Sequence, residues 1–176
     1  LGVTAIANFF LFAYFPLVPV IAKSLDASAV QTGLLLSGTG MGMMIGSTLM
    51  ARLDPYRRGL AYVAGVFAAI GLITPFALAG WYPAALALII ASGVGSGFFG
   101  STQSALVIAE APPHLRGRAL GLLSMAIGAL PLGMYVLGEE AERWGATRAL
   151  IAHSLTGGVL LALWLTRRRE VLSMTT

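Results

Sequence analysis

A stretch of 51 residues without Lys, Arg, Asp or Glu, from Gly59 to Ala109, constrains the fold of this chain more than any other feature. About 20 helical residues cross a bilayer core about 30 Å thick, so this stretch is too long for one crossing and suits two. A turn is predicted at residues 80–83 (Gly-Trp-Tyr-Pro), because Gly ends helices, Pro begins them, and Trp and Tyr favour the membrane boundary. We therefore expect a membrane-spanning helical hairpin here.

The composition of the whole chain indicates an integral membrane protein. Hydrophobic residues make up 57% and charged residues 10%, against roughly 25% charged in ordinary soluble domains. With no cysteine in the chain, disulfides, thiolate metal sites and cysteine nucleophiles are excluded. The net charge of +4 comes from small arginine clusters between apolar runs, which favours a role in membrane orientation over nucleic-acid binding.

Six apolar runs predict an all-α membrane protein with six transmembrane helices in a single domain, residues 1–176. Ser28 and Gln31 have the spacing of a capping box before the second run, and the proline pair at residues 112–113 ends the fourth. Pro131 predicts a kink within the fifth run. Because the first run is already under way at Leu1, we expect a longer parent chain. The predicted spans cover approximately residues 1–22, 28–51, 56–79, 83–109, 114–137 and 148–166.

The distribution of basic residues predicts the orientation. With six spans, eight basic residues fall on the side that holds both chain ends and three fall on the other. An excess of Lys and Arg marks the cytoplasmic side, so both ends are predicted to be cytoplasmic. The eight are Arg52, Arg57, Arg58, Arg116, Arg118, Arg167, Arg168 and Arg169, and the three are Lys23, Arg143 and Arg148.

Two loops resemble those of a known family. Residues 113–118 (Pro-His-Leu-Arg-Gly-Arg) and the glycine-rich segment after them are similar to the Pro-x-x-x-Arg-Gly-Arg loop of drug and siderophore exporters. Residues 46–58 resemble the Asp-Arg-x-Gly-Arg-Arg loop, but Pro55 stands where Arg is usual and the Gly before the arginine pair is missing. Over essentially its whole length the chain resembles the carboxy-terminal six-helix half of a major facilitator superfamily transporter. The cytoplasmic loop and gating residues defined by the resemblance are Asp54, Arg57, Arg58, Arg116 and Arg118.

The resemblance implies a fold and an activity. Each half of such a transporter consists of two inverted three-helix repeats, and substrate binds near the midplane between the halves. It implies alternating-access transport, as proton-coupled antiport or efflux of amphipathic drugs or siderophore-like compounds across the plasma or inner membrane. The expected partners are the lipid bilayer, a small-molecule substrate, and the missing N-terminal six-helix half or a second copy. No cofactor, metal, catalytic residue or nucleic acid is expected.

Helical periodicity supplies candidate substrate contacts on the cavity-lining first and fourth spans. At 100° per residue, one face of the fourth span spreads over about 60° and carries Ser92, Ser96, Phe99, Gln103 and Glu110. Such a polar stripe inside a membrane should face the bundle or water. The first span shows a weaker face of the same kind. The predicted substrate-binding residues are Asn8, Phe12, Ser92, Ser96, Phe99 and Gln103.

The site of proton coupling is expected elsewhere. No Asp or Glu lies deep in any predicted span, so a coupling carboxylate is predicted in the other half of the transporter. Histidine changes charge near neutral pH, but His153 lies in a peripheral span and is interpreted as a hydrogen-bonded structural residue.

Three alternative functions remain open. Gly38, Gly42 and Gly46 form a ridge without side chains that lets another helix approach closely, so a non-transporting membrane scaffold that binds a partner through this ridge is one. Residues 95–100 match GxGxxG, yet a nucleotide site needs a preceding strand and an acid about 20 residues on, which favours helix packing. Ser92 and His153 are the residue types of an intramembrane serine protease, although the Gly-x-Ser-Gly pattern is absent.

Overall fold

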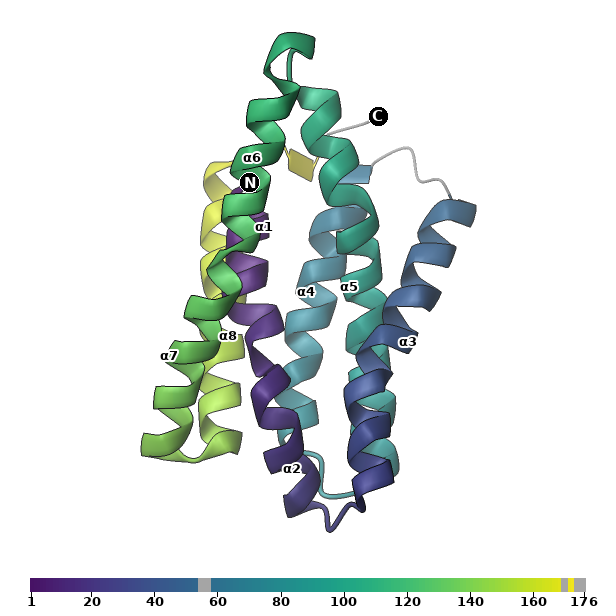
Figure 1. Ribbon diagram of the computed structural model, residues 1–176, viewed down its shortest axis with the longest axis vertical. Coiled ribbons are helices and arrows are strands. Elements are labelled where there is room, and N and C mark those ends of the chain that lie inside the picture. Colours follow the sequence, from purple (N-terminus) through teal and green to yellow (C-terminus); the bar gives the residue numbers. More distant parts are fainter. Residues whose placement is uncertain (54–57, 169–170, 173–176) are drawn as a thin grey trace.

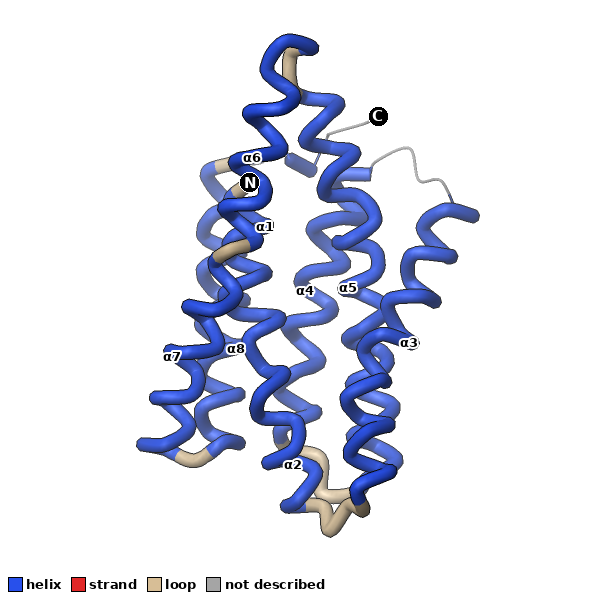
Figure 2. The backbone as a smooth tube through the Cα atoms, viewed as in Figure 1, coloured by secondary structure: helices blue, strands red, loops and turns tan. Residues whose placement is uncertain are grey.

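The computed structural model describes residues 1–53, 58–168 and 171–172 of the chain. Six of the helical stretches in these residues are long and apolar enough to cross a membrane, which confirms the predicted all-α class. Helices and short turns account for the described backbone (Figure 2). In chain order the six stretches are α1 (Gly2–Ile6), η1 (Ala7–Leu11), η2 (Phe12–Leu17) and α2 (Val18–Ser24); α3 (Ala29–Leu53); α4 (Arg58–Ala77); α5 (Tyr82–Glu110); η3 (Pro113–Leu115), α6 (Arg116–Ile127) and α7 (Ala129–Trp144); and α8 (Ala146–Arg167).

The first span is a broken helix. A π-helical turn, η1, follows α1, and a 3₁₀ helix, η2, contains Pro16. Because a proline has no N–H, Pro16 and Pro19 each leave the carbonyl one turn earlier without its α-helical partner. The helix therefore departs from regular geometry in the middle of the span, where π turns often mark functional sites.

The fifth span is also broken. Its two helices meet at Gly128, three residues before Pro131, because the proline ring clashes with the carbonyl of Ile127. Helix α7 continues to Trp144. The acidic residues of this segment form the last turns of the helix, which ends at Gly145, with φ of 84°.

Helices α3, α4 and α5 lie on one side of the bundle, and α6, α7 and α8 lie on the other with the first span between them (Figure 1). The glycine ridge of α3 is covered by α5. A Cβ added at Gly42 would overlap the carbonyl oxygen of Ile90, and one added at Gly46 would overlap that of Val94. A Cβ at Gly38 would lie 2.8 Å from the side chain of Ile89. The ridge thus brings two backbones together within the chain.

Hydrogen bonds between hydroxyl groups join the helices inside the bundle. Thr4 on α1 and Tyr62 on α4 lie 2.8 Å apart at their oxygens, as do Thr74 on α4 and Ser154 on α8. A polar group in a membrane interior needs such a partner because lipid offers none. The predicted capping box is confirmed at the start of α3, where the backbone N–H of Ser28 donates to Gln31 Oε1 at 2.8 Å and that of Gln31 donates to Ser28 Oγ at 3.2 Å.

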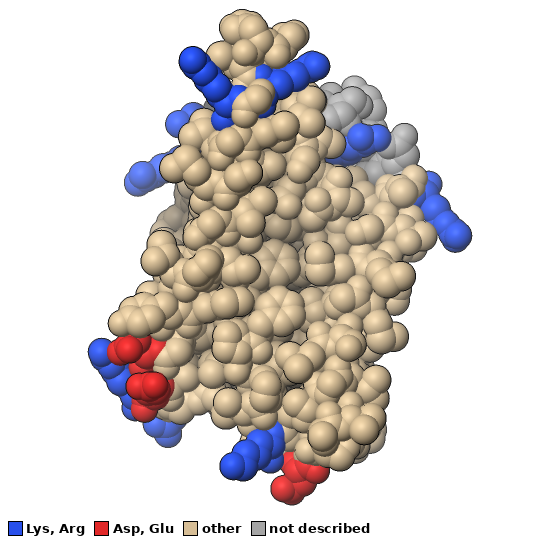
Figure 3. Space-filling view, in the orientation of Figure 1, with Lys and Arg blue, Asp and Glu red and all other residues tan. Residues whose placement is uncertain are grey.

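The charged residues lie at the two ends of the bundle. Figure 3 shows a broad uncharged band between them, with acidic side chains near the α7–α8 turn and at the bottom of the view below α2 and α3, and basic ones at both ends. The end where α3 and α8 finish and α6 begins is called the arginine-rich end; its described arginines are Arg52, Arg58, Arg116, Arg118, Arg167 and Arg168.

Candidate functional site: a groove between the first span and α5

A groove of about 300 Å³ runs between the first span and α5, and α3 and the α6–α7 break complete its wall. Most of its surface is apolar, with two amide side chains placed among the hydrophobic groups. We call it the central groove. It is lined by Asn8, Phe12, Phe15, Met43, Phe99, Gly100, Gln103, Ile127 and Leu130.

Gln103 is the polar group of the central groove with unused bonding capacity. Its Oε1 atom is buried and has no hydrogen-bond partner among the described residues. Leaving a buried acceptor unpaired costs about 1–3 kcal/mol, so such groups call for an explanation. A ligand that donates a hydrogen bond here would remove that cost.

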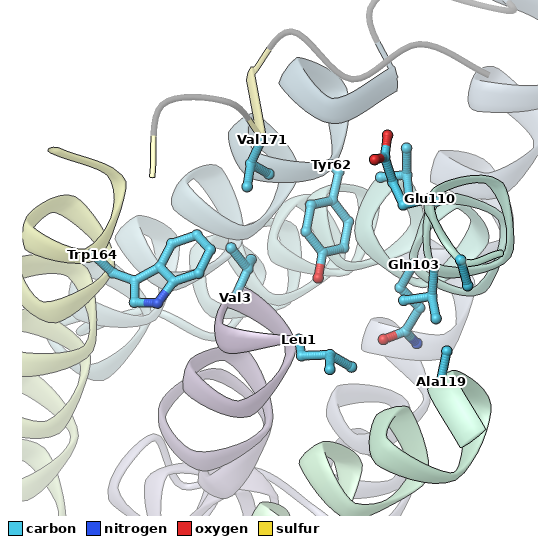
Figure 4. Close-up of a pocket in the computed structure, with 11 residues that line it drawn as sticks. Leu1, Val3, Tyr62, Gln103, Glu110, Ala119, Trp164 and Val171 are labelled. Carbon is cyan, nitrogen blue, oxygen red and sulfur yellow. The ribbon is translucent and has the colours of Figure 1, made fainter. Parts of the chain in front are cut away.

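Gln103 also borders a second cavity of about 260 Å³, nearer the arginine-rich end. Figure 4 shows Gln103 and Glu110 along α5, with Tyr62 from α4, Trp164 from α8 and Ala119 from α6 around the same space. The amide therefore stands in the wall that both cavities share. A group bound at Gln103 can be approached from either one.

Asn8 is positioned by the broken first span. It lies in the π turn, is 5% exposed, and donates from Nδ2 to the carbonyl oxygen of Thr4 at 2.9 Å. Its Oδ1 atom is the remaining acceptor of the amide. The same segment places Phe12 about one helical turn further along the groove than Asn8.

Three aromatic rings support the groove wall. Phe99 stacks on Tyr62 with ring centroids 5.1 Å apart, and it meets Phe12 in a tilted arrangement at 6.0 Å. Phe99 is 1% exposed, so it is held firmly from behind while its edge reaches the groove. Rings fixed in this way present a rigid apolar surface to a bound molecule.

Ser92 and Ser96, predicted on the same stripe as Gln103, lie outside the central groove. Ser92 Oγ donates to the carbonyl oxygen of Ala69 on α4 at 3.0 Å, and Ser96 Oγ donates to Ser92 O at 3.1 Å. Both side chains are buried. The Ser92 bond joins α5 to α4, and the Ser96 bond lies within α5. Both hydroxyl protons are therefore already engaged.

The predicted cytoplasmic loop residues are only partly described. Arg116 and Arg118 are exposed in the first turn of α6, at the arginine-rich end. Arg58 begins α4 and borders a cavity of about 340 Å³ with Ser47 and Ser101. Asp54 and Arg57 lie outside the described residues.

The alternative interpretations meet specific obstacles. Ridge glycines that would bind a scaffold partner already face α5. In the GxGxxG match, Gly95 packs against Gly65 on α4 and Gly97 against Met43 on α3, within one continuous helix. Ser92 and His153 hydrogen-bond to different groups, which separates the two members of a protease pair.

The sequence reasoning missed several groove residues. Gly100 precedes Gln103 by three positions and therefore shares its face, which the helical periodicity already implied. Ile127 and Leu130 flank the α6–α7 break, and the signal for them was Pro131. Met43 had no signal of its own, because its position depends on how α3 crosses α5.

A groove with amide and aromatic walls, set between membrane-spanning helices, is typical of one wall of a transporter cavity. The profile described as Major Facilitator Superfamily matches residues 1–175. The chain therefore belongs to the major facilitator superfamily, and it is a multi-pass membrane protein.

Two curated relatives are similar to the chain, both called "Inner membrane transport protein YdhP", from Escherichia coli strain K12 and Escherichia coli O157:H7. Each is 28% identical over 131 residues, which is 73% of this chain and 32% of the relative. The chain thus spans about a third of the length of the curated relatives it matches. The comparison with solved structures found no match.

Proposed function

We propose that the chain forms one half of a transporter that moves small amphipathic molecules across the membrane by alternating access. The observation that carries this proposal is the buried, unpartnered Oε1 atom of Gln103 in a groove of a major facilitator chain. An unpaired acceptor between aromatic walls suits a molecule with an apolar body and one hydrogen-bond donor.

The proposed binding residues are the four predicted ones that border the central groove: Asn8, Phe12, Phe99 and Gln103. Phe12 and Phe99 supply the apolar contact, and the two amides orient the polar group of the cargo. Ser92 is assigned to the packing of α5 against α4, because its hydroxyl group bonds to Ala69, and Ser96 is assigned to the interior of α5, because its hydroxyl group bonds to the carbonyl of Ser92.

A second six-helix half supplies the opposite wall in this proposal. The family places substrate between two such halves, so the partner is the missing N-terminal half or a second copy of this chain. The single domain of residues 1–176 then corresponds to the C-terminal half. The arginine-rich end lies on the cytoplasmic side of the inner membrane, because basic residues are retained on that side.

Efflux by proton antiport is the direction and coupling that we propose. Its support is the resemblance of residues 113–118 to the loop of drug and siderophore exporters. Arg116 and Arg118 are exposed at the arginine-rich end, where they hold the orientation of the protein and the cytoplasmic end of α6.

The experiment uses the intact natural protein reconstituted in liposomes, with the fluorescent amphipathic cation ethidium as the probe. Gln103→Leu removes the acceptor, so the apparent affinity for ethidium, or for a related dye with a free amino group, should fall roughly tenfold, the value of one hydrogen bond. Ser104→Ala, one residue along on the exposed side of α5, is the matched control and should transport normally.

Membrane insertion of Gln103→Leu should be unchanged, because the substitution replaces an unpaired acceptor by an apolar group. Unchanged transport of every dye tested would remove Gln103 from the binding site. A protein that moves no amphipathic dye in either direction would contradict the proposed function as a whole.

A further inference from the structure

His153 joins three helices at the end of the bundle opposite the arginine-rich end. It lies seven residues after the start of α8, about 10 Å along the helix axis, and its side chain is 2% exposed. Its Nε2 atom is 3.0 Å from the carbonyl oxygen of Phe9 in the π turn, and its Nδ1 atom is 3.0 Å from Oε2 of Glu140 on α7. Both ring nitrogens are therefore engaged.

The two contacts of this ring have a fixed proton requirement. A carbonyl oxygen only accepts, so Nε2 carries a proton toward Phe9. An ionised carboxylate also only accepts, so Nδ1 must carry a proton as well when Glu140 is charged. If the ring is neutral and Glu140 is ionised, one ring nitrogen carries no proton. Two hydrogen-bond acceptors would then face each other at one of the two contacts. Both contacts are complete only when the pair holds one additional proton.

Two aromatic rings flank the imidazole of His153, and its carboxylate partner reaches water. The ring of Phe10 lies 4.8 Å from the imidazole and that of Phe9 lies 5.7 Å from it, centroid to centroid. Aromatic rings attract a cation placed at such distances. The Glu140 side chain is 24% exposed, so a proton can be exchanged with water through the carboxyl group while the imidazole stays buried.

Other charged groups described near the pair are engaged with each other, exposed to solvent or at the opposite end of the bundle. On α7, Arg143 is ion-paired with Glu139 at 3.2 Å, and Glu142 is exposed. The first span has no charged side chain before Lys23 on α2, and α4 has its Arg58 at the opposite end. On α8, Arg148 is exposed, and Ser154 beside the histidine bonds to Thr74 of α4.

The Phe9 carbonyl connects this pair to the central groove. Phe9 directly follows Asn8, and both belong to the π turn whose next residues form the groove wall. Gly133 of α7 packs so closely on the Phe9 carbonyl that a Cβ there would overlap it. Any movement of α7 or α8 relative to this carbonyl therefore acts on the segment that holds Asn8.

We propose that Glu140 and His153 form a proton-binding site that couples to the central groove through the π turn of the first span. When the pair loses its additional proton to water, one of two contacts breaks: the Glu140 contact, which joins α7 to α8, or the Phe9 contact, which joins the first span to α8. This inference rests on the proposed transport function. It places a titrating pair in this half of the transporter, whereas the sequence alone suggested the other half.

The site itself is tested without any cargo, by NMR of the ring nitrogens in the intact protein in lipid, with His153→Gln to identify the signal. Between about pH 5 and about pH 9, the wild type should pass from a doubly protonated to a singly protonated ring. In Glu140→Gln, the new amide donates to Nδ1 of a neutral ring, so the signal should stay that of the Nε2–H form throughout. Glu142→Gln, the same change on the exposed side of α7, should behave like the wild type.

A singly protonated His153 in the wild type over the whole range would overturn the proposal, as would a doubly protonated ring in Glu140→Gln. The coupling is tested in liposomes with ethidium. Glu140→Gln should lose accumulation driven by a pH gradient yet keep exchange at equal pH within about twofold of the wild type. Gradient-driven accumulation equal to that of the wild type would contradict the coupling. Because the NMR signal needs no cargo, a failure of the proton site is distinguishable from a failure of the transport function.

Discussion

Two successive segments of α5 are built for opposite purposes. The glycine segment, residues 93–97, carries Gly93, Gly95 and Gly97, through which the backbone of α5 closely approaches the backbones of α3 and α4. The groove segment, residues 99–103, carries Gly100 and Gln103, where a Cβ added at the glycine would find an ordinary 3.8 Å contact with Met43, and where an amide oxygen is left without a partner.

The difference shows how one membrane helix serves both stability and binding. Without a hydrophobic force between helices in lipid, association depends on close packing and interhelical hydrogen bonds, which small residues allow. The glycine segment uses that source of stability fully. The groove segment gives up part of it, and the vacant bonding capacity of Gln103 is the consequence. Substitutions in the two segments should therefore affect different measurements.

The largest effect on stability is expected for Gly97→Ala. The added Cβ would lie 2.5 Å from the carbonyl oxygen of Met43 and 2.8 Å from the backbone nitrogen of Ser47, so α3 and α5 must separate. Overpacking of this kind costs about 1–3 kcal/mol. The free energy of unfolding in mixed detergent micelles measures it. A variant as stable as the wild type would show that the two helices are not packed as described.

A smaller effect is expected for Ser92→Ala. The substitution removes the hydrogen bond to Ala69 and leaves a carbonyl oxygen on α4 without this donor, at a cost of about 1 kcal/mol. Transport of ethidium should keep its concentration dependence, because Ser92 does not border the central groove. A change in dye selectivity without a loss of stability would instead indicate that Ser92 lines the central groove.

The smallest effect on stability is expected for Gly100→Ala, which changes the same GxGxxG segment by the same methyl group. The open space at this position should keep the change in unfolding free energy within about 1 kcal/mol, since alanine is the better helix former. The methyl group narrows the central groove, so bulky dyes should be transported more slowly than small ones. Equal rates for both would place the cargo away from Gly100.

Much of the fold could be predicted from the sequence, because a charged side chain or an unpaired backbone N–H or C=O group in lipid has a high free-energy cost. The uncharged run between Gly59 and Ala109 and the proline pair at residues 112–113 were enough to separate the spans. The acidic residues after Leu137 form the polar end of α7, and the helix continues to Trp144 because nothing before Gly145 interrupts its backbone bonds.

The candidate site was harder to predict, since periodicity identifies a face but not its neighbour. Ser92 and Gln103 share a stripe, yet 11 residues separate them by about 16 Å along the helix. Over that distance α4 gives way to the groove as the neighbour of the stripe. The contact between Glu140 and His153 depends on how α7 and α8 pair across the turn at Gly145, which no single-helix pattern reveals.

The most direct test of the two segments of α5 uses one engineered thiol at a time, since the chain contributes no cysteine of its own. The intact protein in native membranes is treated with N-ethylmaleimide, in the variants Gln103→Cys and Ser96→Cys. We expect the thiol at position 103 to react and ethidium to slow that reaction, whereas the thiol at position 96 reacts only after denaturation. Equal reactivity at both positions, or no protection by ethidium at position 103, would contradict the assignment of the groove segment as the cargo-binding wall.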